Sequence, residues 1–205
     1  MKRSIPALRL VLISVLVAGC GSVFHKSQPS RYFALSSLSQ AEETKDNSKR
    51  ISVGIDPVRL PGYLDREEIM TRATPNRFVA LAYDRWAEPL DENFTRVLAQ
   101  NLTALLQSDR IIYYPWPPDK KPDYRVEIQV LRFESNWDRE AELSARWTVR
   151  DATGGGRTDF RESRLTRPAK DNSVDGTVAA LSETLADLSR EIANSINIMA
   201  AQRER

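Results

Sequence analysis

Cysteine and histidine are almost absent from this sequence of 205 residues, which contains one of each, Cys20 and His25. A single cysteine cannot form an internal disulfide bond, so we expect a hydrophobic core to stabilise the folded part of the chain. Catalytic Ser-His or Cys-His pairs, and the common zinc and iron sites, need histidine or cysteine inside the fold. Carboxylates remain, but their spacing selects no acid-base pair. We therefore expect no enzyme activity, no metal and no cofactor.

Long hydrophobic runs are also missing. The apolar run at residues 10–17 is too short to cross a bilayer, which takes about 20 residues. Three basic residues, Lys2, Arg3 and Arg9, precede this run, and two small residues lead from it to Cys20. This order is typical of a bacterial lipoprotein signal peptide, which is cleaved before the cysteine, and the cysteine sulfur then carries diacylglycerol. The alternative interpretation is a free cysteine.

The lipoprotein interpretation divides the chain into three parts. Residues 1–19 are the expected signal peptide, residues 20–30 a lipidated tether, and residues 31–205 a single periplasmic domain. Removal of the signal peptide leaves 27 Lys and Arg residues against 28 Asp and Glu residues. Because the remaining chain is close to neutral, its charge gives no reason to expect nucleic acid as a partner.

Two helices are expected from apolar residues that recur every three or four positions. The first such stripe extends from Phe94 to Leu106, with Asp91 as the expected N-cap. The second belongs to a long helix from about residue 175 to residue 202, near the end of the chain. Both stripes are typical of helices that bury one face against a core.

Alternating apolar and polar residues predict the strands, most clearly at residues 141–149, where the alternation is typical of a sheet with one face in solvent. A hairpin is expected around residues 74–77, and a β-bulge near Leu131. The fold class predicted is α+β, a two-layer sandwich of a largely antiparallel sheet and two helices. The expected strands are residues 31–38, 51–60, 68–73, 78–83, 111–114, 124–133, 141–149 and 157–165, the last at an edge of the sheet.

The sequence contains more candidate residues for binding a partner than for catalysis. Aromatic, proline and arginine side chains gather in two loops, and Trp, Tyr and Arg are the residues that most often anchor interfaces. Each of them can equally pack against the core. The candidate partner-binding residues are Pro61, Tyr63, Leu64, Arg66, Arg85 and Trp86.

Five motifs lie in and after these loops: LPGYLDR at residues 60–66, IMTR at 69–72, RWAEPL at 85–90, RVLA at 96–99, and Asn101-Leu102. Together they resemble the PqiC family, the accessory lipoproteins of MCE-type ABC lipid transport systems. The resemblance implies a lipoprotein on the periplasmic face of a Gram-negative outer membrane, with an MCE-domain protein as its partner. Gly21, which follows Cys20 where an Asp would favour retention at the inner membrane, agrees with that address. The family supplies no catalytic residues.

Three functions remain open at this point. The first is an adaptor that docks the end of an MCE tunnel at the outer membrane. The second is a carrier that binds phospholipid in an apolar pocket between sheet and helices. The third is a structural lipoprotein that binds peptidoglycan. The sequence leaves open whether the protein forms a homo-oligomer.

Overall fold

The computed structural model describes residues 28–38, 51–117, 119–154 and 156–203. The expected signal peptide, Cys20 and most of the expected tether lie outside the described residues. No helix within the described residues is both long and apolar enough to cross a membrane.

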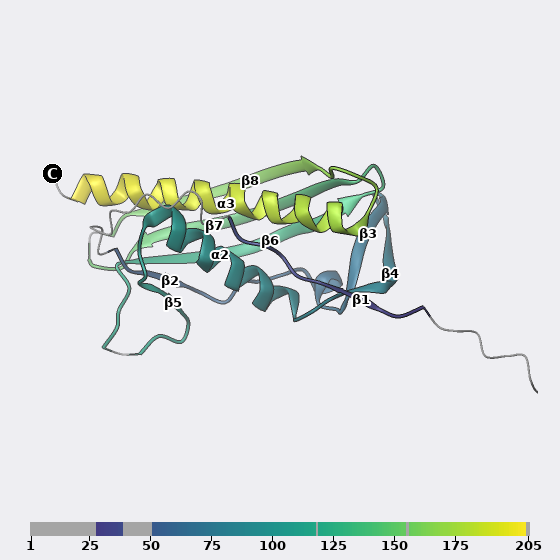
Figure 1. Ribbon diagram of the computed structural model, residues 1–205. Coiled ribbons are helices and arrows are strands. Elements are labelled where there is room, and N and C mark those ends of the chain that lie inside the picture. Colours follow the sequence, from purple (N-terminus) through teal and green to yellow (C-terminus); the bar gives the residue numbers. More distant parts are fainter. Residues whose placement is uncertain (1–27, 39–50, 118, 155, 204–205) are drawn as a thin grey trace, which may run out of the picture.

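The sheet has eight strands, arranged around the long central strand β6 (Figure 1). One edge of β6 pairs with β7, which in turn pairs with β8. The other edge of β6 is shared by β2 near its beginning and by β3 near its end. Strand β5 extends the sheet beyond β2, while β4 and then β1 extend it beyond β3. The strands are β1 (Arg31–Phe33), β2 (Val53–Ile55), β3 (Glu68–Thr74), β4 (Arg77–Trp86), β5 (Ile111–Tyr113), β6 (Tyr124–Asn136), β7 (Glu140–Asp151) and β8 (Thr158–Pro168).

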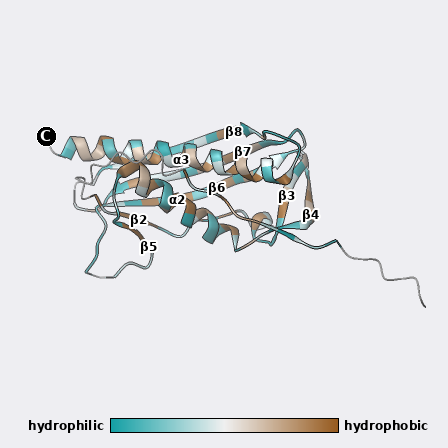
Figure 2. Ribbon diagram, in the orientation of Figure 1, coloured by the Kyte–Doolittle hydropathy of each residue, from teal (hydrophilic) through white to brown (hydrophobic). Residues whose placement is uncertain are grey.

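Two helices, α2 (Leu90–Leu106) and α3 (Val174–Arg203), cover one face of this sheet (Figure 1). Apolar and polar residues alternate along both helices (Figure 2), as expected for helices with one buried face. Leu185 and Ile192 of α3 are fully buried, as are Leu143 and Val149 of β7. The long strand pairs β3-β4, β6-β7 and β7-β8 are antiparallel, and the short pairs are parallel. The prediction of a two-layer α+β sandwich with a long C-terminal helix is confirmed.

Most predicted elements are present. The bulge lies between Val130 and Arg132, the hairpin turns at residues 75–76, and β8 lies at the edge of the sheet. The expected N-cap Asp91 is wrong, because α2 begins at Leu90 and the backbone carbonyl of Pro89 accepts the first helical bond from Asn93. Asp91 lies in the first turn, where a carboxylate interacts favourably with the helix dipole.

Two predicted strands are shorter than expected. Residues 51–60 form a strand only at Val53–Ile55, after which Pro57 interrupts the pairing and a single bridge joins Arg59 to Gln129. Residues 31–38 form a strand only at Arg31–Phe33, because the residues that follow cross the helices and bond to their side chains.

Candidate functional site

The N-terminal segment, residues 31–38, joins the expected tether to the folded domain. Its strand β1 pairs in parallel with β4. Beyond β1, the backbone N–H of Leu35 donates to Asn93 Oδ1 at 3.2 Å, and that of Leu38 donates to Asn101 Oδ1 at 2.8 Å. Both asparagines are fully buried on α2. The segment is therefore fixed to the fold first by β4 and then by side chains of α2.

Asn101 also connects the two helices, because its Nδ2 donates to Ser189 Oγ of α3 at 3.1 Å. Ser182 of α3 accepts the backbone N–H of Ser36 at 3.1 Å. Asn101 belongs to the family motifs, and its structural role is to hold the N-terminal segment against α2 and α3. No local sequence pattern indicates this role, because the partners lie up to 88 positions away in the chain.

The six candidate partner-binding residues lie in the loop before β3 and, contrary to the expectation of a second loop, at the end of strand β4, and these two segments are joined. The backbone N–H of Trp86 donates to the carbonyl of Glu67 at 2.7 Å, and Arg85 Nη1 lies 2.7 Å from Glu67 Oε2. Leu64 and Trp86 are core residues, with 2% and 6% of their surface exposed. Pro61, Tyr63 and Arg85 are half-buried, and Arg66 is exposed. The surface available to a partner is therefore formed by the polar and proline members of the set.

A buried carboxylate organises the loop that contains Tyr63. Glu134 on β6 is 3% exposed, and its Oε2 accepts the Tyr63 hydroxyl at 2.7 Å and the Phe133 backbone N–H at 2.9 Å. Its Oε1 lies 2.6 Å from Nη2 of Arg72 on β3. The Arg72 guanidinium also lies over the ring of Phe78, at 4.2 Å from the ring centroid. The carboxylate is thus paired and hydrogen-bonded, as a buried charge requires.

Tyr63 is held in place on two sides. Its ring stacks on Phe78 with 4.5 Å between centroids. Burial raises the pKa of the Tyr63 hydroxyl, and its hydrogen bond to Glu134 raises that pKa further. The hydroxyl therefore remains a proton donor to Glu134 at neutral pH, so this cluster stabilises the loop and has no free base for proton transfer.

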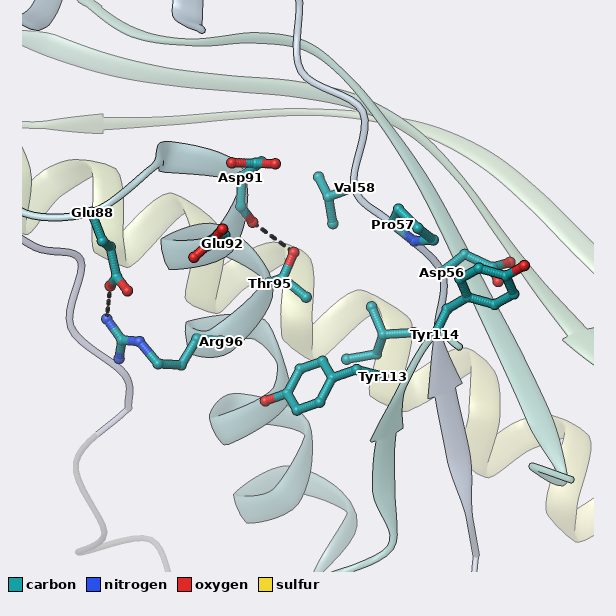
Figure 3. A pocket seen from close by; sticks show the side chains of 11 residues that line it. Asp56, Pro57, Val58, Glu88, Asp91, Glu92, Thr95, Arg96, Tyr113 and Tyr114 are labelled. Atoms are coloured by element: carbon teal, nitrogen blue, oxygen red, sulfur yellow. Dashed lines mark hydrogen bonds and ion pairs between the residues drawn. The ribbon is translucent and has the colours of Figure 1, made fainter. Parts of the chain in front are cut away.

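An open groove lies between the first turns of α2 and the end of β5 (Figure 3). Its volume is about 450 Å³, in the range of ligand pockets. The exposed tyrosines Tyr113 and Tyr114 form one side, and Figure 3 shows the Tyr113 ring pointing toward α2. Partial burial raises the pKa of Tyr113. The lining residues are Ile55, Asp56, Pro57, Val58, Glu88, Asp91, Glu92, Thr95, Arg96, Tyr113 and Tyr114.

The groove carries an excess of negative charge. Arg125 donates to both carboxylate oxygens of Asp56, at 2.9 and 3.0 Å. Arg96 forms an ion pair with Glu88. Asp91 and Glu92 are exposed, and no cation among the described residues pairs with them. Sequence patterns could not reveal this groove, because its walls come from three separate stretches of the chain.

The loop after β5 covers the other face of the sheet beside the groove. Trp116 contacts Gly54 of β2, where an added Cβ would lie 2.9 Å from its Cζ3. The Arg125 guanidinium lies over the Trp116 ring, at 5.0 Å from its centroid, and Tyr114 meets Trp116 edge to face at 5.4 Å.

Within the described residues, no group of three or more His, Cys, Asp or Glu side chains is arranged to hold a metal ion.

Comparison with known families matches residues 33–193 to the ABC-type transport auxiliary lipoprotein component. The chain belongs to this family. Its fold is similar to the crystal structure of protein XCC0632 from Xanthomonas campestris, with 16% identity, a TM-score of 0.69, and coverage of 85% of this chain and 99% of that one. A crystal structure of an uncharacterized protein is also similar, with 20% identity, a TM-score of 0.68, and coverage of 82% and 99%. No curated protein matches the sequence. At these identities the structural likeness supports the fold alone.

Proposed function

We propose that this protein is the outer-membrane-anchored accessory lipoprotein of an MCE-type transport system, that it docks the MCE tunnel, and that it supports lipid transport between the inner and outer membranes. The observation that carries the proposal is the family match over residues 33–193, which makes the protein an auxiliary component of ABC-type transport. The motifs that resemble the PqiC family are the basis for proposing an MCE-domain protein as the partner. The expected lipid on Cys20 supplies the anchor.

The position of the N-terminal segment supports an anchored adaptor. The described chain begins at Gln28, eight residues after Cys20 and three residues before β1, which pairs with the end of β4. Eight extended residues reach about 29 Å at most. The end of the domain that carries β4 therefore stays close to the membrane when Cys20 is lipidated. The loop with Arg66 and the end of β4 with Arg85 lie together through the ion pair of Arg85 with Glu67.

The groove beside α2 gives no support to the phospholipid-carrier alternative. Its free carboxylates, Asp91 and Glu92, would repel a phosphate headgroup. No observation on the described residues favours peptidoglycan binding either.

Affinity purification of the full-length protein from its native cells tests the partner surface. Charged replacements at Tyr63 and Leu64 are unsuitable, because these side chains support the fold. Arg66→Glu changes an exposed side chain and is expected to reduce recovery of the MCE-domain protein. Arg150→Glu, an equal charge reversal at an exposed position of β7, is the control and should leave recovery unchanged. Equal recovery with both variants would show that this loop is not the interface.

A further inference from the structure

Strand β5 leaves one edge of the sheet unpaired. It pairs only with β2, and the described part of the chain adds no strand on its other side. The backbone carbonyl of Arg110 accepts from Val53 at 3.0 Å, and the backbone N–H of Tyr114 donates to Ile55 at 3.0 Å. Alternate residues of a strand bond to the same neighbour, so Ile111 and Tyr113 direct their N–H and C=O groups toward the free edge. A free edge of this kind is a template for an added strand.

The groove described above begins at this edge. One wall is the first turns of α2, with Glu92 and Thr95, and the other is Tyr113 with its ring directed toward the helix (Figure 3). Tyr113 and Tyr114 are 48% and 55% exposed, which is a large apolar area for two adjacent side chains. Successive side chains of a strand point to opposite faces, so Tyr113 faces α2 and Tyr114 faces the side of Trp116. A chain that paired with β5 would therefore place alternate side chains beside Tyr113 and α2, and the others over Tyr114.

The charges of the groove select a basic occupant. Arg96 is paired with Glu88, and Arg125 with Asp56, so the charge of each arginine is offset by a carboxylate. Asp91 and Glu92 have no cationic partner among the described residues. Lysine or arginine side chains of an incoming segment would pair with them, whereas acidic segments would be repelled.

We propose that the groove between α2 and β5 binds an extended segment of a partner protein, which pairs with β5 as an additional strand. The segment alternates apolar side chains, which cover Tyr114, with lysine or arginine side chains, which lie beside Tyr113 and meet Asp91 and Glu92. None of the six candidate partner-binding residues lines this groove. The inference does not depend on the identity of the transport partner.

A synthetic eight-residue peptide that alternates valine and lysine, carrying a fluorescent label, is the probe. Fluorescence anisotropy measures its binding to the full-length protein in detergent at low salt. We expect saturable binding that weakens as sodium chloride is added. The double variant Asp91→Asn with Glu92→Gln should bind about tenfold more weakly. Asp65→Asn with Asp138→Asn, which removes two exposed carboxylates elsewhere, should bind as the wild type does.

A second pair of variants tests strand addition itself. Tyr113→Pro removes the N–H that points to the free edge and should abolish binding, while the bonds of Arg110 and Tyr114 to β2 remain. Tyr113→Ala keeps that N–H and should retain most of the binding. Hydrogen exchange of the peptide-bound protein should slow at residues 111–113, and circular dichroism checks that each variant is folded.

Three results would overturn the proposal. The first is no saturable binding of the basic peptide. The second is equal binding by the wild type, the Asp91 and Glu92 double variant and Tyr113→Pro. The third concerns the protein without peptide. If hydrogen exchange at residues 111–113 slows as the protein concentration rises, the groove is an interface between copies of this chain.

Discussion

Arg72 of β3 and Glu134 of β6 form an ion pair, with 2.6 Å between Nη2 and Oε1, in which the carboxylate is almost completely buried. This pair lies where β3 and β6 share only two residue pairs, Thr71 with Ser135 and Arg72 with Asn136. The backbone ladder is therefore short at the point where the β3-β4 hairpin joins the main sheet. The ion pair, together with Tyr63, strengthens that junction.

Loss of Arg72 is expected to destabilise the protein strongly. Arg72→Leu leaves Glu134 buried without its cation, and such a change costs about 3–5 kcal/mol. Urea denaturation measures the free energy of unfolding. The matched double variant adds Glu134→Gln, which removes the buried charge but keeps an acceptor for Tyr63, and it should recover part of the loss. If the double variant is no more stable than Arg72→Leu, the buried charge is not the cause.

Tyr63→Phe should cost about 1.5–3 kcal/mol, because it removes a hydrogen bond to a carboxylate. The cost should depend on pH. Because the pKa of Tyr63 is raised in the folded state, its contribution is fully present below the ordinary tyrosine pKa of about 10 and declines as pH rises above that value. Chemical denaturation of both proteins between pH 8 and pH 11 measures the difference, with Tyr83→Phe as the exposed control. If the difference in free energy of unfolding between the wild type and Tyr63→Phe grows with pH, the pKa of Tyr63 is not raised in the folded state.

Asn101→Ala should loosen the N-terminal segment. The change removes the acceptor for the Leu38 N–H and the donor to Ser189, and buried polar groups left unpaired cost about 1–3 kcal/mol. Limited proteolysis should then cleave the chain near residues 35–38 faster than in the wild type. Thr103→Ala, an exposed change on the same helix, is the control. Equal cleavage rates would show that Asn101 does not hold the segment.

Gly54→Ala should destabilise the region between β2 and the loop that contains Trp116. The added Cβ would lie 2.8 Å from Pro122 Cγ and 2.9 Å from Trp116 Cζ3, so both side chains must move. Overpacking of this kind typically costs about 1–3 kcal/mol. Thermal unfolding provides the measurement. Gly62→Ala is the matched control, because no heavy atom lies within 4 Å of its added Cβ. A neutral Gly54→Ala would mean that the loop is not packed on β2.

The secondary structure could be predicted where burial repeats with a fixed period. Residues 141–149 alternate because β7 has the helices on one face and polar side chains on the other. The stripe of α3 is regular because one face of the helix is buried from Gly176 to Met199. Shorter elements were predicted less well, because side-chain bonds end β1 and Pro57 interrupts the segment after β2.

The candidate site could be predicted only in part. Aromatic residues in loops look alike in sequence whether they are exposed or buried, and the packing of the fold decides that Trp86 is buried and Trp137 is exposed. Nothing local indicates that β2 and β3 share one edge of β6, and this arrangement leaves β5 unpaired beside α2. The groove therefore arises from tertiary structure alone.

The central claim, an auxiliary lipoprotein held at the outer membrane by Cys20, is tested most directly by labelling with radioactive palmitate followed by membrane fractionation. We expect the wild-type protein to be labelled, to fractionate with the outer membrane and to recover the MCE-domain protein in mild detergent. Cys20→Ala should be folded, unlabelled and absent from the membrane fraction. Continued labelling of Cys20→Ala, or wild-type protein found only in the inner membrane, would contradict the account.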